Sequence, residues 1–104
     1  MLQELTDADF AREVIDSGLR WAVLFSSKWC GGCAAMTPRV EALAAARPDL
    51  RFGKADIGSC PRTAAALGVL SIPAVILFRE GKEAARLAGA VSADELERAM
   101  ERLG

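Results

Sequence analysis

The sequence predicts an α/β fold in which helices cover both faces of one mixed β-sheet. Residues 21–25 and 74–78 are runs of consecutive apolar side chains, which are typical of strands buried on both faces. The first half of the chain alternates strand, helix and strand, an order that requires parallel strands joined by a crossover helix. The second half ends with two strands joined by a tight turn and then a helix, so antiparallel pairing is expected in the same sheet.

Length, composition and charge narrow the possible functions. With 104 residues, 52% of them hydrophobic, the chain has the size and apolar content of one domain, predicted over residues 1–104. Thirteen Lys and Arg against fourteen Asp and Glu leave a net charge of -1, so we expect no nucleic-acid partner, which would need a basic excess. No apolar run approaches the about 20 residues that span a bilayer, so we expect no membrane segment. The acidic start lacks the features of a signal peptide, which predicts a cytoplasmic location.

Sulfur is the only strong nucleophile with an evident setting in this chain. Histidine and tyrosine are absent, which excludes hydrolases built on Ser/His or Cys/His pairs and removes the commonest zinc ligand. The three cysteines are Cys30, Cys33 and Cys60. Because their number is odd, they cannot form the fully paired framework of a small secreted protein.

Turn and capping signals divide the first part of the chain. A short strand at 2–5 precedes a helix at 6–17, which begins with Thr6 as its N-cap and ends at Gly18. The buried strand 21–25 follows, and no repeat or linker interrupts the order.

A long alanine-rich helix follows residues 26–33 and continues to about Ala46, with an expected kink at Pro38. Its inner face is formed by apolar residues at helical spacing, namely Met36, Val40, Leu43 and Ala44. A weaker strand pattern occupies residues 51–57.

Four elements are expected in the second half. They are a helix at 61–68, strands at 74–78 and 83–87 joined by a turn at 80–81, and a final helix at 92–103. Pro61 suits the first position of a helix, and Glu80-Gly81 suits a hairpin turn. Ser92 and Glu95 have the spacing of a capping box.

Cys30 and Cys33 lie between a buried strand and a long helix, which places Cys30 near the N-cap and Cys33 in the first turn. Residues three apart in a helical turn share a face, so the two sulfur atoms can reach disulfide distance. The unpaired N–H groups and the helix dipole favour a thiolate at Cys30. Such a thiolate can attack a partner disulfide, and the second thiol then resolves the mixed disulfide. The pattern therefore predicts thiol–disulfide exchange.

Metal binding is the main alternative for a C-x-x-C pair. No second C-x-x-C and no histidine are present, so a four-ligand zinc site, or a [2Fe–2S] cluster held by Cys30 and Cys33, would need two chains. We expect no metal and no organic cofactor.

The sequence Trp-Cys-Gly-Gly-Cys at 29–33 resembles the Trp-Cys-Gly-Pro-Cys motif of the thioredoxin family. The resemblance continues through Met-Thr-Pro at 36–38, Lys-Ala-Asp at 54–56, the stretch 68–74 around Ile-Pro, and the hairpin and loop at 78–92. It covers essentially the whole chain. It implies a thioredoxin fold, with one mixed sheet of four to five strands and four flanking helices.

The resemblance also implies roles for individual residues. Cys30 is then the attacking thiolate and Cys33 the resolving thiol. A cis bond between Ile72 and Pro73 places the Ile72 backbone beside the dithiol, where it pairs with an extended substrate segment. The implied substrate-binding surface comprises Trp29, Gly31, Gly32, Ile72, Pro73 and Gly89. Taken alone, Trp29 suits a core position better than a contact position.

Partners follow from the same resemblance. We expect a monomer whose substrates are disulfide-containing proteins and whose electrons come from a flavin-dependent thioredoxin-type reductase. Two alternatives stay open: an oxidase- or isomerase-biased member of the fold, and a binding adaptor whose cysteines are incidental.

Leu24 departs from the family pattern, since thioredoxins usually carry a buried aspartate there, regarded as the proton acceptor for the resolving cysteine. Leucine cannot accept a proton, so Cys33 must use water or another group. Lys54 matches the family lysine that accompanies this aspartate, and its ordinary alternative is a surface lysine. If Lys54 is buried with no acid beside it, its charge lowers the pKa of Cys33 directly.

Further departures concern the active-site surface. Gly32 replaces the usual proline, which frees the reduced loop and favours a more oxidising protein. Ser26 stands where tryptophan is common in the family, and Ala34 stands where a basic residue often follows the second cysteine. Both changes are expected to alter the active-site surface and weaken reductase recognition.

Cys60 is either a loop or capping residue without a role, or a partly exposed redox-sensitive thiol.

Overall fold

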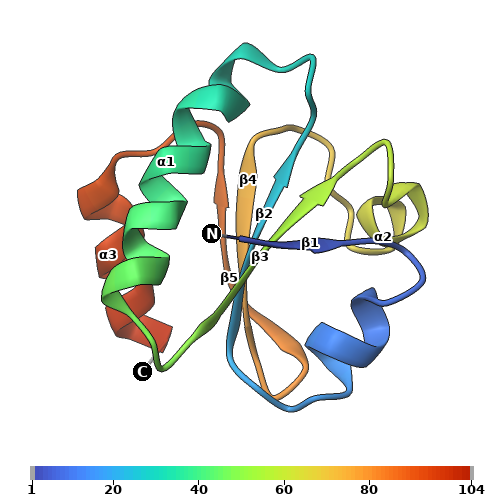
Figure 1. Cartoon of the computed structure of the whole chain (residues 1–104), viewed down its shortest axis with the longest axis horizontal. Helices are drawn as coiled ribbons and strands as arrows, with labels where there is room; N and C mark the ends of the chain where they lie inside the picture. The colour runs from blue at the N-terminus through green and yellow to red at the C-terminus, as the bar shows by residue number, and fades with distance from the viewer. Residues whose placement is uncertain (1, 104) are drawn as a thin grey trace.

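A five-stranded sheet in the order β1-β3-β2-β4-β5 forms the centre of the molecule, in a computed structural model that describes residues 2–103 (Figure 1). The strands are β1 (Gln3–Leu5), β2 (Trp21–Ser26), β3 (Arg51–Asp56), β4 (Ala74–Arg79) and β5 (Lys82–Ala88). β3 runs parallel to β1 and β2, whereas β4 runs antiparallel to β2 and β5. The mixed α/β sheet predicted from the order of elements is confirmed.

Helices cover the two faces of the sheet. They are η1 (Ala11–Ile15), α1 (Gly31–Ala46), α2 (Pro61–Ala66) and α3 (Ala93–Leu103). α1 and α3 lie on one side of the sheet, and η1 and α2 lie on the other (Figure 1). Among residues 2–103, no helix has the length and apolar character needed to cross a bilayer.

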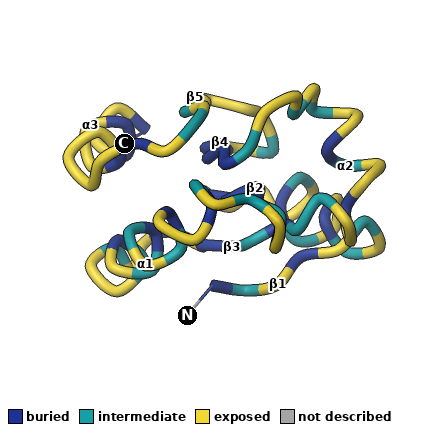
Figure 2. The backbone as a smooth tube through the Cα atoms, turned by 90° about the horizontal axis from the view of Figure 1, so that it is seen from above, coloured by how far each residue is buried: buried dark blue, intermediate teal, exposed yellow. Residues whose placement is uncertain are grey.

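The alternation of side chains along β2 and β4 divides the core into two layers. Leu24 and Leu77 point toward α1 and α3, where they pack with Met36. Phe25 and Phe78 point the other way and pack with the residues under η1 and α2. Because both faces are covered, β2 is buried along its whole length, and the buried segments of Figure 2 are concentrated at β2 and β4.

The first helix differs from the expected one. A turn precedes a π-helix at Ala11–Ile15, in which the Asp16 N–H donates to the Ala11 carbonyl at 2.7 Å. Apolar spacing alone does not separate the two helix types, because Phe10 and Val14 are buried in either. The helix ends at Ile15, before the predicted end at Gly18, although the φ of 70° at Gly18 suits glycine.

The two local motifs of the second half form as predicted. Glu80 and Gly81 have φ angles of 55° and 78°, the left-handed values that a tight hairpin between β4 and β5 needs. The Ser92 N–H donates to Glu95 Oε1 at 3.3 Å, and the Glu95 N–H donates to Ser92 Oγ at 3.2 Å. This reciprocal pair is the capping box that opens α3.

Candidate active site

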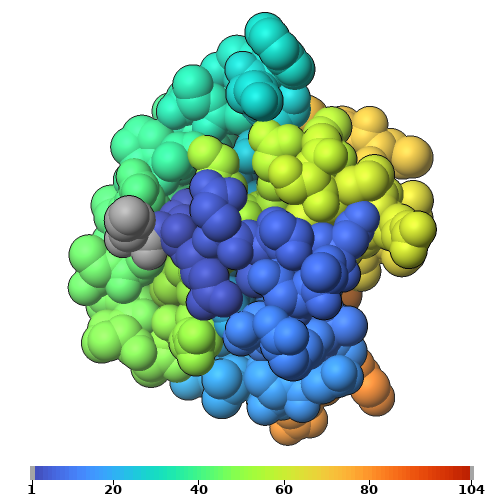
Figure 3. All heavy atoms as spheres, turned by 45° about the vertical axis from the view of Figure 1, so that its right-hand side comes forward, coloured from blue at the N-terminus to red at the C-terminus, as the bar shows by residue number. Residues whose placement is uncertain are grey.

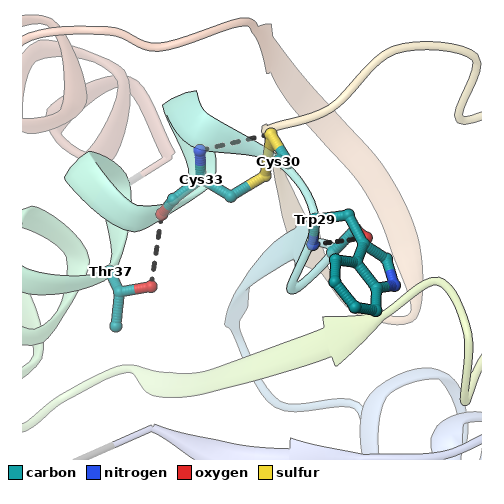
Figure 4. The surroundings of a disulfide bond; sticks show 5 residues. Trp29, Cys30, Cys33 and Thr37 are labelled. Atoms are coloured by element: carbon teal, nitrogen blue, oxygen red, sulfur yellow. Dashed lines mark hydrogen bonds between the residues drawn. A yellow bond between two sulfur atoms is a disulfide. The ribbon is translucent and has the colours of Figure 1, made fainter.

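The dithiol lies where β2 ends and α1 begins. Cys30 is the N-cap residue of α1, and Cys33 lies in the first turn, as the sequence predicts. The two residues form a disulfide with their Cα atoms 5.3 Å apart (Figure 4). The loop before them is held by Ser27, whose carbonyl accepts from the Cys30 N–H at 3.2 Å.

The two cysteines have unequal surroundings. Cys33 is 3% exposed, whereas Cys30 is half-buried at the end of the helix. Cys30 Sγ also accepts a hydrogen bond from the Cys33 N–H at 3.2 Å (Figure 4). In the reduced protein, that N–H and the helix dipole favour negative charge on Cys30. The sulfur of Cys30 is therefore accessible to another molecule, whereas the sulfur of Cys33 is shielded.

The loop before β4 faces the dithiol. The peptide bond between Ile72 and Pro73 is cis, as the resemblance implied. A Cβ atom at Gly32 would lie 3.4 Å from Pro73 Cδ, so the first turn of α1 packs directly on the proline ring. The Gly89 N–H donates to the Pro73 carbonyl at 2.8 Å, which joins the loop after β5 to the same place.

Trp29 is exposed, contrary to what its residue type alone suggests. Its side chain is 88% exposed and points away from the two sulfur atoms (Figure 4). The Trp29 N–H donates to Ser27 Oγ at 3.2 Å, so the backbone of this loop is fixed while the indole stays in solvent. Gly31 is also exposed. Trp29 therefore does not pack in the core, and its ring adds apolar surface next to Cys30.

A cavity of about 210 Å³ lies next to the disulfide. Its lining contains Cys30, Cys33 and Lys54, together with an acid, Asp56. Lys54 is half-buried, so it is neither a plain surface lysine nor a lysine without an acid nearby. The condition of a buried Lys54 with no acid in its surroundings is therefore not met. Sequence reasoning missed Asp56, although its spacing of two from Lys54 places both on one face of β3.

Leu24 and Ser26 occupy neighbouring positions on the same face of β2. Leu24 is fully buried in the core under α1, where it replaces a charged group with packing. Ser26 is 2% exposed, so the expectation that it alters the active-site surface is wrong. The serine lines the cavity instead, because β2 continues through residue 26 and directs it inward. Ala34 is exposed, as that expectation required.

Cys60 is not a partly exposed thiol, which corrects the functional interpretation of this residue. It is fully buried at the N-cap of α2, and its thiol donates to the Leu5 carbonyl at 3.1 Å. Burial raises the pKa of Cys60 to about 11, and the nearby carboxylates of Asp7 and Asp9 add to the shift. A thiol this buried and this weakly acidic is unreactive.

Comparisons with known proteins match nearly the whole chain and its fold. The sequence model named Thioredoxin matches residues 1–102. The thioredoxin of Chlamydia trachomatis serovar D is 44% identical over 96 residues, which is 92% of each chain. The oxidized mitochondrial thioredoxin 3 of Saccharomyces cerevisiae superimposes with a TM-score of 0.88 at 29% identity, covering 97% of this chain and 94% of that one. A structure concerning the thiol resolving mechanism in yeast mitochondrial 1-Cys peroxiredoxin matches with a TM-score of 0.87 at 28% identity and the same two coverages.

Proposed function

The chain belongs to the thioredoxin family, and from this membership we propose that it reduces disulfides of other proteins through Cys30 and Cys33. As a family member with a joined cysteine pair, it is a thiol–disulfide oxidoreductase. The unequal burial of the two cysteines supports different roles for them in this reaction. Cys30 attacks the substrate disulfide, and the shielded Cys33 then displaces the substrate sulfur from Cys30.

The substrate segment binds along the loop that contains Ile72 and Pro73. The Ile72 backbone lies in the loop before β4, next to the Pro73 ring that packs on the first turn of α1, and can pair with an extended segment. Trp29, the residue before Cys30, adds an exposed apolar ring. Gly31, Gly32 and Gly89 complete this surface, because residues without side chains leave the backbone open to a partner.

Reduction of insulin disulfides by dithiothreitol tests the activity. The wild-type protein is expected to accelerate the reaction, and Cys30→Ser to abolish the acceleration. Cys33→Ser is expected to accumulate a mixed disulfide with the substrate, because the resolving thiol is missing. Cys60→Ala is the matched control and should retain activity. An adaptor with incidental cysteines would show no acceleration over buffer.

Other proteins complete the cycle. A flavin-dependent thioredoxin-type reductase supplies the electrons. Proteins with disulfides, including peroxiredoxins, accept these electrons. The yeast structure concerning peroxiredoxin resolution supports this class of substrate. Incubation with such a reductase, followed by counting free thiols, tests the first partner. The monomeric state and the cytoplasmic location stay predictions, which sedimentation and cell fractionation test.

An oxidase or isomerase bias is the second candidate. Two residues favour it: Leu24 removes the buried carboxylate from the core, and Gly32 loosens the loop between the cysteines. The reduction potential of the Cys30/Cys33 pair against glutathione decides between the two directions, since a potential above that of the compartment makes the protein an oxidant.

A further inference from the structure

We propose that Asp56 accepts, through water in the cavity beside the disulfide, the proton that Cys33 loses when it resolves the mixed disulfide. The proposal rests on the function above, because only a resolving Cys33 must give up a proton at this step. Asp56 acts on Cys33 through water and is therefore a positioning residue rather than a catalytic one.

The register of β2 and β3 shows how the Asp56 carboxylate can act as proton acceptor near Cys33, although residue 24 is not an acid. Leu24 pairs with Lys54, and Ser26 pairs with Asp56. Side chains two apart on a strand share a face, so all four side chains belong to the face covered by α1. Asp56 stands two register pairs further along the strands than Leu24, at the end of β2 from which the chain enters the Cys30 loop.

The cavity joins Asp56 to the cysteines. It is lined by Cys30, Cys33 and Asp56 among others, and its volume of about 210 Å³ exceeds the roughly 30 Å³ that one water occupies in the liquid. The lining also includes Ser26, whose hydroxyl is buried and has no hydrogen-bond partner within the part of the chain that the structure describes. A buried hydroxyl without a partner is costly, so a water between it and the carboxylate is favoured.

The contacts of Asp56 leave one of its two carboxylate oxygens open to cavity water. Lys54 from β3 and Lys28 from the loop after β2 are the two cations in the cavity lining, and the cysteines are its other titratable groups. Asp56 Oδ1 accepts from the Gly58 N–H at 2.8 Å, which orients the carboxylate. Within residues 2–103, Oδ2 has no protein donor, so it is available to water.

The step balances in atoms and electrons. The Cys33 thiol gives its proton to cavity water, which passes a proton to the Asp56 carboxylate. The Cys33 sulfur then attacks Cys30 Sγ, the bond between Cys30 and the substrate sulfur breaks, and the substrate leaves as a thiolate with the bonding electron pair. The protein dithiol is oxidised to a disulfide, and the substrate disulfide is reduced by two electrons. Asp56 afterwards releases its proton to solvent or to the leaving thiolate.

Rapid mixing of the reduced protein with one equivalent of the chromogenic disulfide dithiobis(nitrobenzoate) separates the two chemical steps. Attack by Cys30 releases the first coloured thiolate, and resolution by Cys33 releases the second. Asp56→Asn keeps an oxygen that can accept from Gly58 but removes the base. We expect it to leave the first phase unchanged and to slow the second phase at neutral pH by about tenfold, a modest share of what general base catalysis contributes. The pH dependence of the second-phase rate of Asp56→Asn should shift to higher pH than in wild type.

Three further variants make the test decisive. Asp56→Glu should restore most of the second-phase rate, and Asp16→Asn, the same charge change at an exposed site, should not alter it. Ser26→Ala should slow the second phase with the same displacement of the pH profile, which provides a test should Asp56→Asn fail to fold. The proposal is overturned if the second-phase rate of Asp56→Asn, or of Ser26→Ala in its place, matches wild type at every pH. It is also overturned if the second phase of Asp56→Glu or of Asp16→Asn is as slow as that of Asp56→Asn.

Failure of the proposed function has a different signature. A wild-type protein that shows no first phase, or a Cys33→Ser variant that still shows both phases, would contradict the assignment of Cys30 and Cys33 themselves. Those results do not depend on Asp56.

Discussion

Gly32 affects the reduction potential of the dithiol through the freedom of the turn between the two cysteines. It lies in the first turn of α1 between the two cysteines, with the Pro73 ring against it. In the disulfide form the bridge restrains this turn, whereas in the reduced form glycine leaves it free. Because the turn has more conformational freedom in the reduced form, reduction of the Cys30–Cys33 disulfide is favoured.

Gly32→Pro is therefore expected to lower the reduction potential of the Cys30/Cys33 pair. Proline removes conformational freedom from the reduced loop, an effect of up to about 1 kcal/mol, which is equivalent to roughly 20 mV for a two-electron couple. Equilibration with glutathione redox buffers measures the potential. Gly32→Ala is the matched control and should give a smaller decrease, and an unchanged or raised potential in Gly32→Pro would contradict the argument.

Among elements, α2 shows a helix whose cap comes from a distant part of the chain. Cys60 at its N-cap position makes no side-chain hydrogen bond to the helix. Asp7 does so instead: its carboxylate accepts from the N–H groups of Arg62 and Thr63 at 3.0 and 2.8 Å, and from the Thr63 hydroxyl at 2.7 Å. Figure 3 shows the N-terminal segment packed against the region of α2. Local sequence signals identified Pro61 but not this cap.

Asp7→Asn is expected to reduce stability at neutral pH and to lose that effect in acid. The hydrogen bond from the Thr63 hydroxyl, with those from the Arg62 and Thr63 N–H groups, lowers the pKa of Asp7 below 3.8. A lowered pKa in the folded state means that the charged carboxylate stabilises the fold above its unfolded pKa, and that this contribution disappears as the pH falls through the folded value.

Urea unfolding of Asp7→Asn and wild type across this pH range measures the difference in unfolding free energy. Asp16→Asn, exposed at the end of η1, is the control and should change the pH dependence little. If the difference between Asp7→Asn and wild type persists below the folded pKa, the cap does not act through its charge.

For the molecule as a whole, the two-sided core determines which cysteines can react. β2 and β4 are covered on both faces, and Cys60 is buried in the layer under η1 and α2. The reactive pair lies at the edge of the other layer, where α1 begins. The same fold therefore leaves Cys30 accessible to partners, with the shielded Cys33 behind it, and keeps Cys60 away from them.

Alkylation of the folded, reduced protein should label Cys30 first and the shielded Cys33 more slowly. Cys60 is expected to react only after global unfolding, because burial keeps reagents away and raises its pKa to about 11. Mass spectrometry after labelling with and without denaturant counts the modified thiols. Three labels on the folded protein would show that the α2 face opens locally.

The sequence determined on its own whatever depends on local spacing. The dithiol at the start of a helix, the hairpin at Glu80-Gly81 and the capping box at Ser92 each involve residues within a few positions, so their geometry follows from local chemistry. Only the tertiary structure decided that Asp7 caps α2 and that Asp56 shares a cavity with Cys33. It also decided that Cys60 and Ser26 are buried. These outcomes depend on strand register and on the packing of distant segments, which no short-range pattern encodes.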